Sequence, residues 1–276
     1  MNFYLQSLFI AVPSFIILIL IESFVSRIKG ININEHEDMI SSLSSGITNT
    51  TKDAFKVGIV LISYAWLVDK ITIYKLEPLW LAIFVAFIVQ DFTGYWMHRL
   101  NHRVNMFWNR HIIHHSSEEF NLSCALRQSI SETFKFSAIL MIPAALLGIP
   151  VKIFIILGPI HLFMQFWYHT RLINKMGFLE YIIVTPSHHR VHHAINPEYL
   201  DKNYSQILII WDKLFNTFQP EMHTPKYGIL HNIKSYNPLY IATHEWIDML
   251  RDLKWKNGIV KNFNYIFKPP EWKHKN

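Results

Sequence analysis

Three clusters of histidine are the residues of this chain whose type and spacing could do chemistry. They read HRLNH at residues 98–102, HIIHH at 111–115 and HRVHH at 189–193. Residues i, i+3 and i+4 of an α-helix share one face, so we expect each HxxHH segment to aim three imidazoles at one point. Imidazole is a common ligand of iron, zinc, copper and nickel. The spacing therefore predicts a metal site.

The predicted ligands are the histidines of these clusters, together with two further candidates close to them. A structural zinc ion is satisfied by four ligands, which often include cysteine, and this chain has 1 cysteine. A larger, nitrogen-rich set beside a membrane predicts two ions and favours iron that activates dioxygen, with a pair of zinc ions as the alternative. The cluster histidines are His98, His102, His111, His114, His115, His189, His192 and His193, and the further candidates are His169 and His188.

Two aspartates are candidates for holding a ligand imidazole in place. Asp91 shares one helical stripe with His98 and His102, at spacings of i, i+7 and i+11. An ionisable side chain in an apolar stretch is usually functional, and a carboxylate that orients a ligand imidazole is common; a helix cap or an ion pair with Arg99 is the alternative. Asp212 in WDKLF has two equal interpretations, a cap or a bond to a histidine. No catalytic residue beyond the metal ligands is predicted.

A short helix is predicted around the third cluster. Thr185 suits the N-cap and Pro186 the first turn, and Asn196-Pro197 would end the helix. A helix of about two to three turns does not hold itself in water. Metal binding can supply the stability that such a segment lacks.

The composition predicts a helical membrane protein around these clusters. The 276 residues are 51% hydrophobic and 17% charged, whereas a soluble domain has about 25% charged residues. We expect one domain, residues 1–276, with an all-α, polytopic integral membrane fold of about four or five spans. Spans are expected at residues 3–25, 54–74, 78–97 and 134–167, the last as a tight pair or a re-entrant hairpin. The histidine boxes then occupy residues 98–115 and 169–193, and a cytosolic helical cap occupies residues 194–276.

The distribution of charge predicts the orientation of these spans. No Lys or Arg precedes the first span, and Arg27 and Lys29 follow it, so we expect its C-terminal end in the cytosol. A hairpin at residues 134–167 then returns the chain to the same side, and all the histidine clusters face one compartment. We therefore expect a multi-pass membrane protein with its site facing the cytoplasm.

The net charge of +6 does not predict a nucleic-acid partner, because no basic stripe with interleaved aromatic residues accompanies it. Contact with an anionic membrane surface is the better interpretation of this charge. Cys124, as a single cysteine, excludes an internal disulfide and fits a reducing compartment. Its expected role is packing in the core.

Four segments resemble the membrane fatty acid hydroxylase and sterol desaturase superfamily, and within it the alkylglycerol monooxygenase branch. They are WNRHIIHHSSEEFNLSCALRQS, QFWYHT, TPSHHRVHH and DKNYSQILIIWDKLFNTF, and the similarity runs from about residue 91 to residue 218. The resemblance implies a di-iron monooxygenase that uses O2 and oxidises a membrane lipid. In this branch tetrahydrobiopterin supplies electrons, and the carbon beside an ether oxygen is hydroxylated. Other relatives act on fatty acyl chains, sterols or carotenoids.

Three departures from the branch bear on these expectations. Arg103 stands where the branch has a glutamate, which leaves the electron donor open between tetrahydrobiopterin and an electron-donor protein. Asn216 replaces the glycine of the WDKLFGT-type motif. The chain also stops without the long hydrophobic C-terminal extension of the animal enzymes, so we expect a bacterial relative in an inner membrane. A membrane metal-binding or transport protein is the alternative of another class. Its ligands would lie near the bilayer midplane, whereas these histidines lie beyond the ends of the predicted spans.

Overall fold

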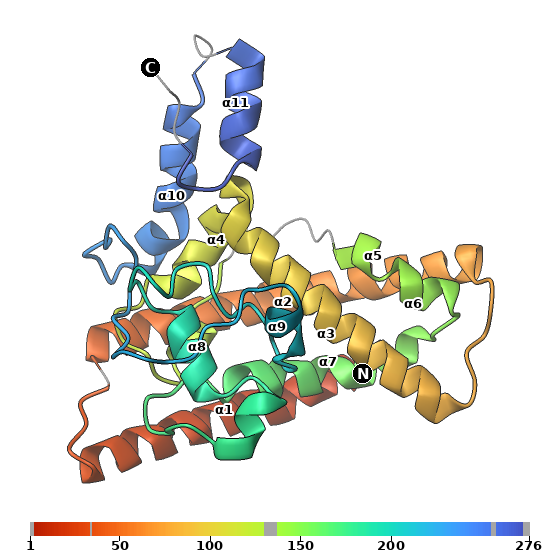
Figure 1. The fold of residues 1–276 in the computed structure, drawn as a ribbon, viewed down its shortest axis with the longest axis horizontal. Helices are drawn as coiled ribbons and strands as arrows, with labels where there is room; N and C mark the ends of the chain where they lie inside the picture. The colour runs from red at the N-terminus through yellow and green to blue at the C-terminus, as the bar shows by residue number, and fades with distance from the viewer. Residues whose placement is uncertain (1–2, 34, 130–136, 255–257, 273–276) are drawn as a thin grey trace.

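A computed structural model describes residues 3–33, 35–129, 137–254 and 258–272, and these ranges contain helices and loops without a strand (Figure 1). Two isolated β-bridges pair Ile183 with Leu208 and Ala194 with Tyr227. The predicted all-α class is confirmed. In chain order the elements are α1 Phe3–Ile28, α2 His36–Ile71, α3 Leu79–Arg103, α4 Asn105–His115, η1 Cys124–Leu126, α5 Ser137–Leu140, α6 Ile142–Leu146, α7 Val151–Phe166, η2 Gly177–Tyr181, α8 Pro186–His192, α9 Ile210–Leu214, α10 Pro238–Asp252 and α11 Gly258–Phe267.

The long helices form a bundle whose outer surface is apolar. Helix α7 contacts α1, α2 and α3 (Figure 1). Phe15 of α1 stacks on Phe166 of α7 with ring centroids 4.1 Å apart, and Tyr64 of α2 meets Phe154 of α7 at 5.0 Å. Outside the bundle, Leu20 of α1 is 63% exposed. An apolar exterior around an apolar interior is typical of helices in lipid.

Two described helices are long and apolar enough to cross a bilayer. They are Ile10–Ile28 within α1 and Leu79–Arg103, which is α3, and they coincide with the predicted spans at 3–25 and 78–97. The predicted span at 54–74 lies in α2, where the side chains of residues 49–61 lie outside the described part. The total number of spans stays a prediction.

The predicted hairpin at 134–167 is described from residue 137 onward. Its arms are unequal, because α5 and α6 have 4 and 5 residues whereas α7 has 16. Gly148 forms the turn with a φ of +60°, and a Cβ there would lie 2.9 Å from Cγ2 of Thr72, so the turn requires glycine. The choice between a tight pair of spans and a re-entrant hairpin stays a prediction.

The segment from residue 194 onward is only partly helical. Residues 194–236 run mainly as loops around α8, with α9 as their one described helix, and α10 and α11 then form an upright hairpin (Figure 1). The predicted helical cap is therefore mixed in structure. Its loops matter for the site, because they surround the helix that carries the third histidine cluster.

Candidate metal centre

Five histidines from three helices converge on one point, and we call them the five-histidine group. Each member offers one ring nitrogen, and these nitrogens all lie within 4.8 Å of one another. Helices α3 and α4 are consecutive and pack together, so pairs at i and i+4 on each helix face one another. The members are His98 and His102 of α3, His111 and His115 of α4, and His192 of α8.

Four further histidines form a second set, the four-histidine group, also with their ligand nitrogens within 4.8 Å of one another. His114 comes from α4 and His189 from α8, while His193 caps the C-terminal end of α8. His169 follows the end of α7, where the apolar hairpin returns to the site. All four side chains are buried.

Each HxxHH segment divides its histidines between the two groups, which corrects the expectation that each would aim at one point. In the first segment His111 and His115 join the five-histidine group, and His114 joins the other. In the second segment His192 belongs to the five-histidine group, and His189 and His193 belong to the four-histidine group. Successive residues of a helix are about 100° apart around its axis, so the two adjacent histidines of each segment point to different centres.

The outer ring nitrogens of four histidines indicate which tautomer these rings adopt. Because a neutral imidazole carries one proton, a Nδ1 atom that donates outward leaves the lone pair on Nε2 facing inward. Four Nδ1 atoms each face a backbone carbonyl oxygen. The pairs are His98 with the carbonyl of Tyr204 (2.8 Å), His192 with Lys202 (2.9 Å), His114 with Arg127 (3.3 Å) and His169 with Phe166 (3.3 Å).

The inner nitrogens crowd together in a way that suits a cation. Nε2 of His98 lies 3.0 Å from Nε2 of His111, and Nε2 of His189 lies 2.8 Å from Nε2 of His169. Two lone pairs cannot bond each other at such distances, whereas a metal ion among them accepts both. Nε2 of His192 is buried without a hydrogen-bond partner in the described structure. The residues present therefore fit a metal ion in each group.

The electrostatics keep these imidazoles in the form that binds metal. Burial lowers the pKa of His115 and His193 well below the ordinary value, and neighbouring histidines lower it further. Burial also lowers the pKa of His114 to about 4. Metal ligation requires neutral imidazole. Among the described residues neither group includes cysteine or carboxylate, so the donors are all nitrogen, as suits iron, zinc, copper or nickel.

His188 is the one predicted ligand that the structure does not bring to either group. Its Nδ1 lies 3.3 Å from the backbone N of Thr185 and closes the capping box at the start of α8. Its Nε2 lies 3.4 Å from a carboxylate oxygen of Glu180. The capping box confirms Thr185 as the N-cap, and it accounts for His188 by a structural contact.

The two predicted aspartates lie behind the histidines and contact backbone groups. Asp91 accepts hydrogen bonds from the backbone N–H groups of Ile207 and Leu208 and from the indole of Trp211. The structure thus joins α3 to the loop before α9 through this carboxylate.

Asp212 is connected to His98 through one intermediate residue, Tyr204. It accepts from the backbone N–H of Tyr204 at 2.8 Å, and the carbonyl of Tyr204 is the group that His98 contacts. It also accepts from Ser205 and Thr217. Its role in the structure is to shape this loop, and it does not bond a histidine directly.

Asp201 lies near His102, and no sequence pattern predicted this aspartate as part of the site. Oδ1 of Asp201 lies 3.6 Å from Nδ1 of His102, and Oδ2 pairs with Arg103. Burial alone would raise the pKa of Asp201, but the contacts with His102 and Arg103 outweigh it and hold the pKa at about 2. Asp201 lies in a loop with a φ of 59°, and no helical spacing connects it to a cluster.

Buried polar pairs fix the loops around the four-histidine group. Arg127, whose carbonyl faces His114, pairs with Asp38 of α2 at 2.6 Å, and both side chains are buried. Glu22 of α1 accepts from the hydroxyl of Thr170, the neighbour of His169, at 2.5 Å. Sequence separations of 89 and 148 residues hide both contacts from any local pattern.

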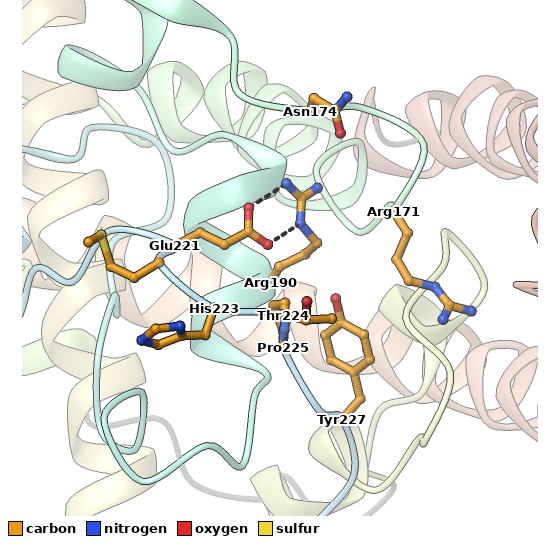
Figure 2. A pocket seen from close by; sticks show the side chains of 9 residues that line it. Arg171, Asn174, Arg190, Glu221, His223, Thr224, Pro225 and Tyr227 are labelled. Atoms are coloured by element: carbon orange, nitrogen blue, oxygen red, sulfur yellow. Dashed lines mark hydrogen bonds and ion pairs between the residues drawn. The ribbon is translucent and has the colours of Figure 1, made fainter.

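A cleft of about 350 Å³ is lined by Arg190 of α8 and by residues that include Glu221 and Tyr227 (Figure 2). Arg190 crosses it and donates to both carboxylate oxygens of Glu221, at 2.7 and 2.8 Å. Tyr227 lines the cleft and stacks on Phe120 with centroids 5.0 Å apart, and Phe120 in turn stacks on His169 at 5.7 Å. The cleft thus abuts the four-histidine group through two aromatic rings.

Comparison with known proteins gives one family and several relatives. A family model described as fatty acid hydroxylase matches residues 83–217, the range that holds every predicted ligand. Alkylglycerol monooxygenase of Homo sapiens is 40% identical over 265 residues, and that of Danio rerio is 39% identical over 269 residues. Each alignment covers 95% of this chain. An ornithine lipid hydroxylase of Rhizobium tropici is 30% identical over 141 residues, which are 51% of this chain and 43% of that protein.

The chain spans 59% of the length of the human and zebrafish proteins. No solved structure matches it. The similarity therefore covers nearly all of this chain and about three fifths of those two relatives.

Proposed function

We propose that this chain is an O2-dependent lipid monooxygenase with two histidine-bound irons, and the match of residues 83–217 to the fatty acid hydroxylase family model supports the proposal. The observation that carries the proposal is the pair of all-histidine groups, five and four rings with their ligand nitrogens turned inward. This set exceeds the needs of one ion. The first of these histidines lie on α3, one of the two described helices that are long and apolar enough to cross a bilayer.

We propose as ligands the nine histidines of the two groups. When bound, the irons would supply dioxygen activation and cleavage of a lipid C–H bond. The chain's own residues would orient the ligands, because in four of the nine histidines a backbone carbonyl holds the proton on Nδ1 and leaves Nε2 free to bind. Burial excludes water from the site, and the ring of Tyr168 covers His189 with centroids 4.3 Å apart.

An ether lipid is the substrate that the similarity to alkylglycerol monooxygenases favours. One oxygen atom of O2 would be inserted into a C–H bond of the carbon beside the ether oxygen. The other oxygen atom would be reduced to water by two electrons and two protons from the donor and solvent. The hemiacetal formed then breaks into a fatty aldehyde and glycerol. Hydroxylation of an acyl chain is the second candidate, because a relative is an ornithine lipid hydroxylase.

The electron donor in this proposal is tetrahydrobiopterin, with an electron-donor protein as the alternative. Arg103 is the residue that separates this chain from the expected pattern. It pairs with Asp201 and lies 3.3 Å from Glu271. This arginine therefore supports the loop that carries Asp201. An assay of turnover with each electron donor distinguishes the two alternatives.

We place the protein in the membrane as one domain, residues 1–276, with the metal centre on the cytoplasmic side and residues 194–276 covering it. The support is the charge pattern around α1, with Arg27 and Lys29 following the first span. A bacterial inner membrane is part of this proposal, and the relatives reported above include one from the bacterium Rhizobium tropici.

The test is lipid oxidation by purified protein in proteoliposomes loaded with iron. An alkylglycerol, O2 and tetrahydrobiopterin are added, and fatty aldehyde is measured by mass spectrometry. We expect aldehyde from the wild-type chain and none from His114→Ala. Turnover by the variant, or metal movement across the vesicle wall without any lipid product, would contradict the proposal.

A further inference from the structure

Helix α11 presents a continuous apolar stripe on its outer face. Ile259 is 85% exposed, Val260 73%, Phe263 58% and Phe267 44%. Residues 259, 263 and 267 are four apart and share one face of the helix. Large apolar side chains gathered in this way mark a surface that contacts a membrane or a partner.

The other side of α11 is polar and is held by the protein. The hydroxyl of Tyr265 donates to Asp252 at 2.8 Å, and the side chain of Asn262 donates to the carbonyl of Lys254 at 3.0 Å. Both bonds join α11 to the end of α10 (Figure 1). The apolar stripe is therefore directed outward by fixed contacts.

A second set of bonds places one end of α11 beside the end of a candidate span. The backbone N–H of Asn105 donates to the carbonyl of Lys268 at 2.9 Å. The side-chain amide of Asn105 donates to the backbone carbonyl of Tyr265 at 3.0 Å. Asn105 lies two residues after Arg103, where α3 ends. In Figure 1, α11 rises from this point across the direction of α1 and α2. A helix in this position would run along a membrane surface, at the level where α3 leaves it.

The sequence that includes α11 has a net positive charge, which complements an anionic surface. Residues 253–276 contain six lysines, at positions 254, 256, 261, 268, 273 and 275, and one acid, Glu271. The difference, six minus one, leaves five positive charges. A helix with lysines on its polar face and aliphatic or phenylalanine side chains on the other lies in the interface plane of anionic bilayers.

We infer that α11 lies in the surface of the bilayer that holds the spans, with its apolar stripe among anionic phospholipids. Helices α10 and α11 both contact α4, which carries three of the nine histidines. Contact with lipid would therefore hold α4 at a fixed height above the membrane. The inference rests on the proposed membrane placement and is independent of the oxidation chemistry.

The test measures the depth of single fluorescent labels in nanodiscs. Cys124 is buried, so an introduced cysteine is the reactive thiol. We compare Phe263→Cys with Lys261→Cys on the same helix, and use Ile17→Cys, on the exposed side of α1, as the membrane control. Each variant carries a bimane label in phosphatidylcholine discs with and without phosphatidylglycerol. Nitroxide lipids and aqueous iodide serve as the two quenchers.

The expected result is that nitroxide lipid quenches the label at 263 several-fold more than the label at 261, with iodide showing the reverse. Phosphatidylglycerol should increase the contrast. If the label at 17 is quenched by lipid and the label at 263 is quenched by iodide alone, the inference fails while the membrane placement stands. Shielding of the label at 263 from both quenchers would also overturn it, because a protein surface would then cover the stripe. Absence of lipid quenching at 17 would refute the placement itself.

Discussion

The two histidine groups are supported from different parts of the chain. In the five-histidine group, the outer nitrogens of three ligands face a single short loop, residues 201–204, through two carbonyls and one carboxylate. In the four-histidine group, His114 faces the carbonyl of Arg127 and His169 faces that of Phe166. One group therefore depends on one loop, and the other depends on two separated segments.

The contacts behind these segments differ as well. The loop at 201–204 is held by Asp212, a neighbour in sequence. The segments of the four-histidine group are held by Asp38 on α2 and Glu22 on α1, which lie far away in sequence. Because the supports are separate, a substitution behind one group should weaken that group and spare the other.

The largest expected effect comes from removing one ligand of either group. His111→Ala and His114→Ala should each abolish lipid oxidation, a loss beyond the about 10–100-fold that outer partners of metal ligands cost. Each variant should keep the metal of the untouched group. Metal content and turnover are measured together on the purified proteins. Loss of all metal from both variants would show that the groups form one cooperative site.

The next effect comes from the buried pair behind the four-histidine group. Asp38→Asn leaves the Arg127 guanidinium unpaired in the interior, which should cost about 3–5 kcal/mol of unfolding free energy. The loss is measured by thermal or denaturant unfolding in detergent. Asp248→Asn, which breaks the exposed pair with Arg251, is the matched control and should cost about 0–1 kcal/mol. Equal losses in the two variants would refute a special role for the buried pair.

A smaller and more local effect is expected behind the five-histidine group. Asp212→Asn weakens the acceptor for Tyr204 and should lower metal affinity at this group about 10–100-fold. Competition with a chelator measures that affinity. The four-histidine group should retain its metal, and a matching loss there would contradict separate support.

The sequence predicted which histidines converge better than it predicted how they divide into two groups. Nine of the ten predicted histidines lie in the groups, because helical spacing is a local property that ligand pairs must obey. The division of HxxHH was missed because it depends on where α3, α7 and α8 pack around α4. Asp201 and Asp38 were missed because each reaches the site from a distant loop or helix. Thr185 was found because an N-cap is also a local signal.

The smallest effect is expected at His188. His188→Ala should leave both metals bound and reduce stability by about 1 kcal/mol through loss of the capping contact. His189→Ala, its neighbour in the four-histidine group, is the control that should lose one metal. The metal content of the two purified variants is measured. Loss of metal from His188→Ala would show that His188 is a ligand.

The most direct test of the central claim is an anomalous diffraction map of the iron-loaded protein at the iron absorption edge. Two separate peaks are predicted, one enclosed by His98, His102, His111, His115 and His192, and one by His114, His169, His189 and His193. A single peak, or a peak outside these rings, would contradict the account.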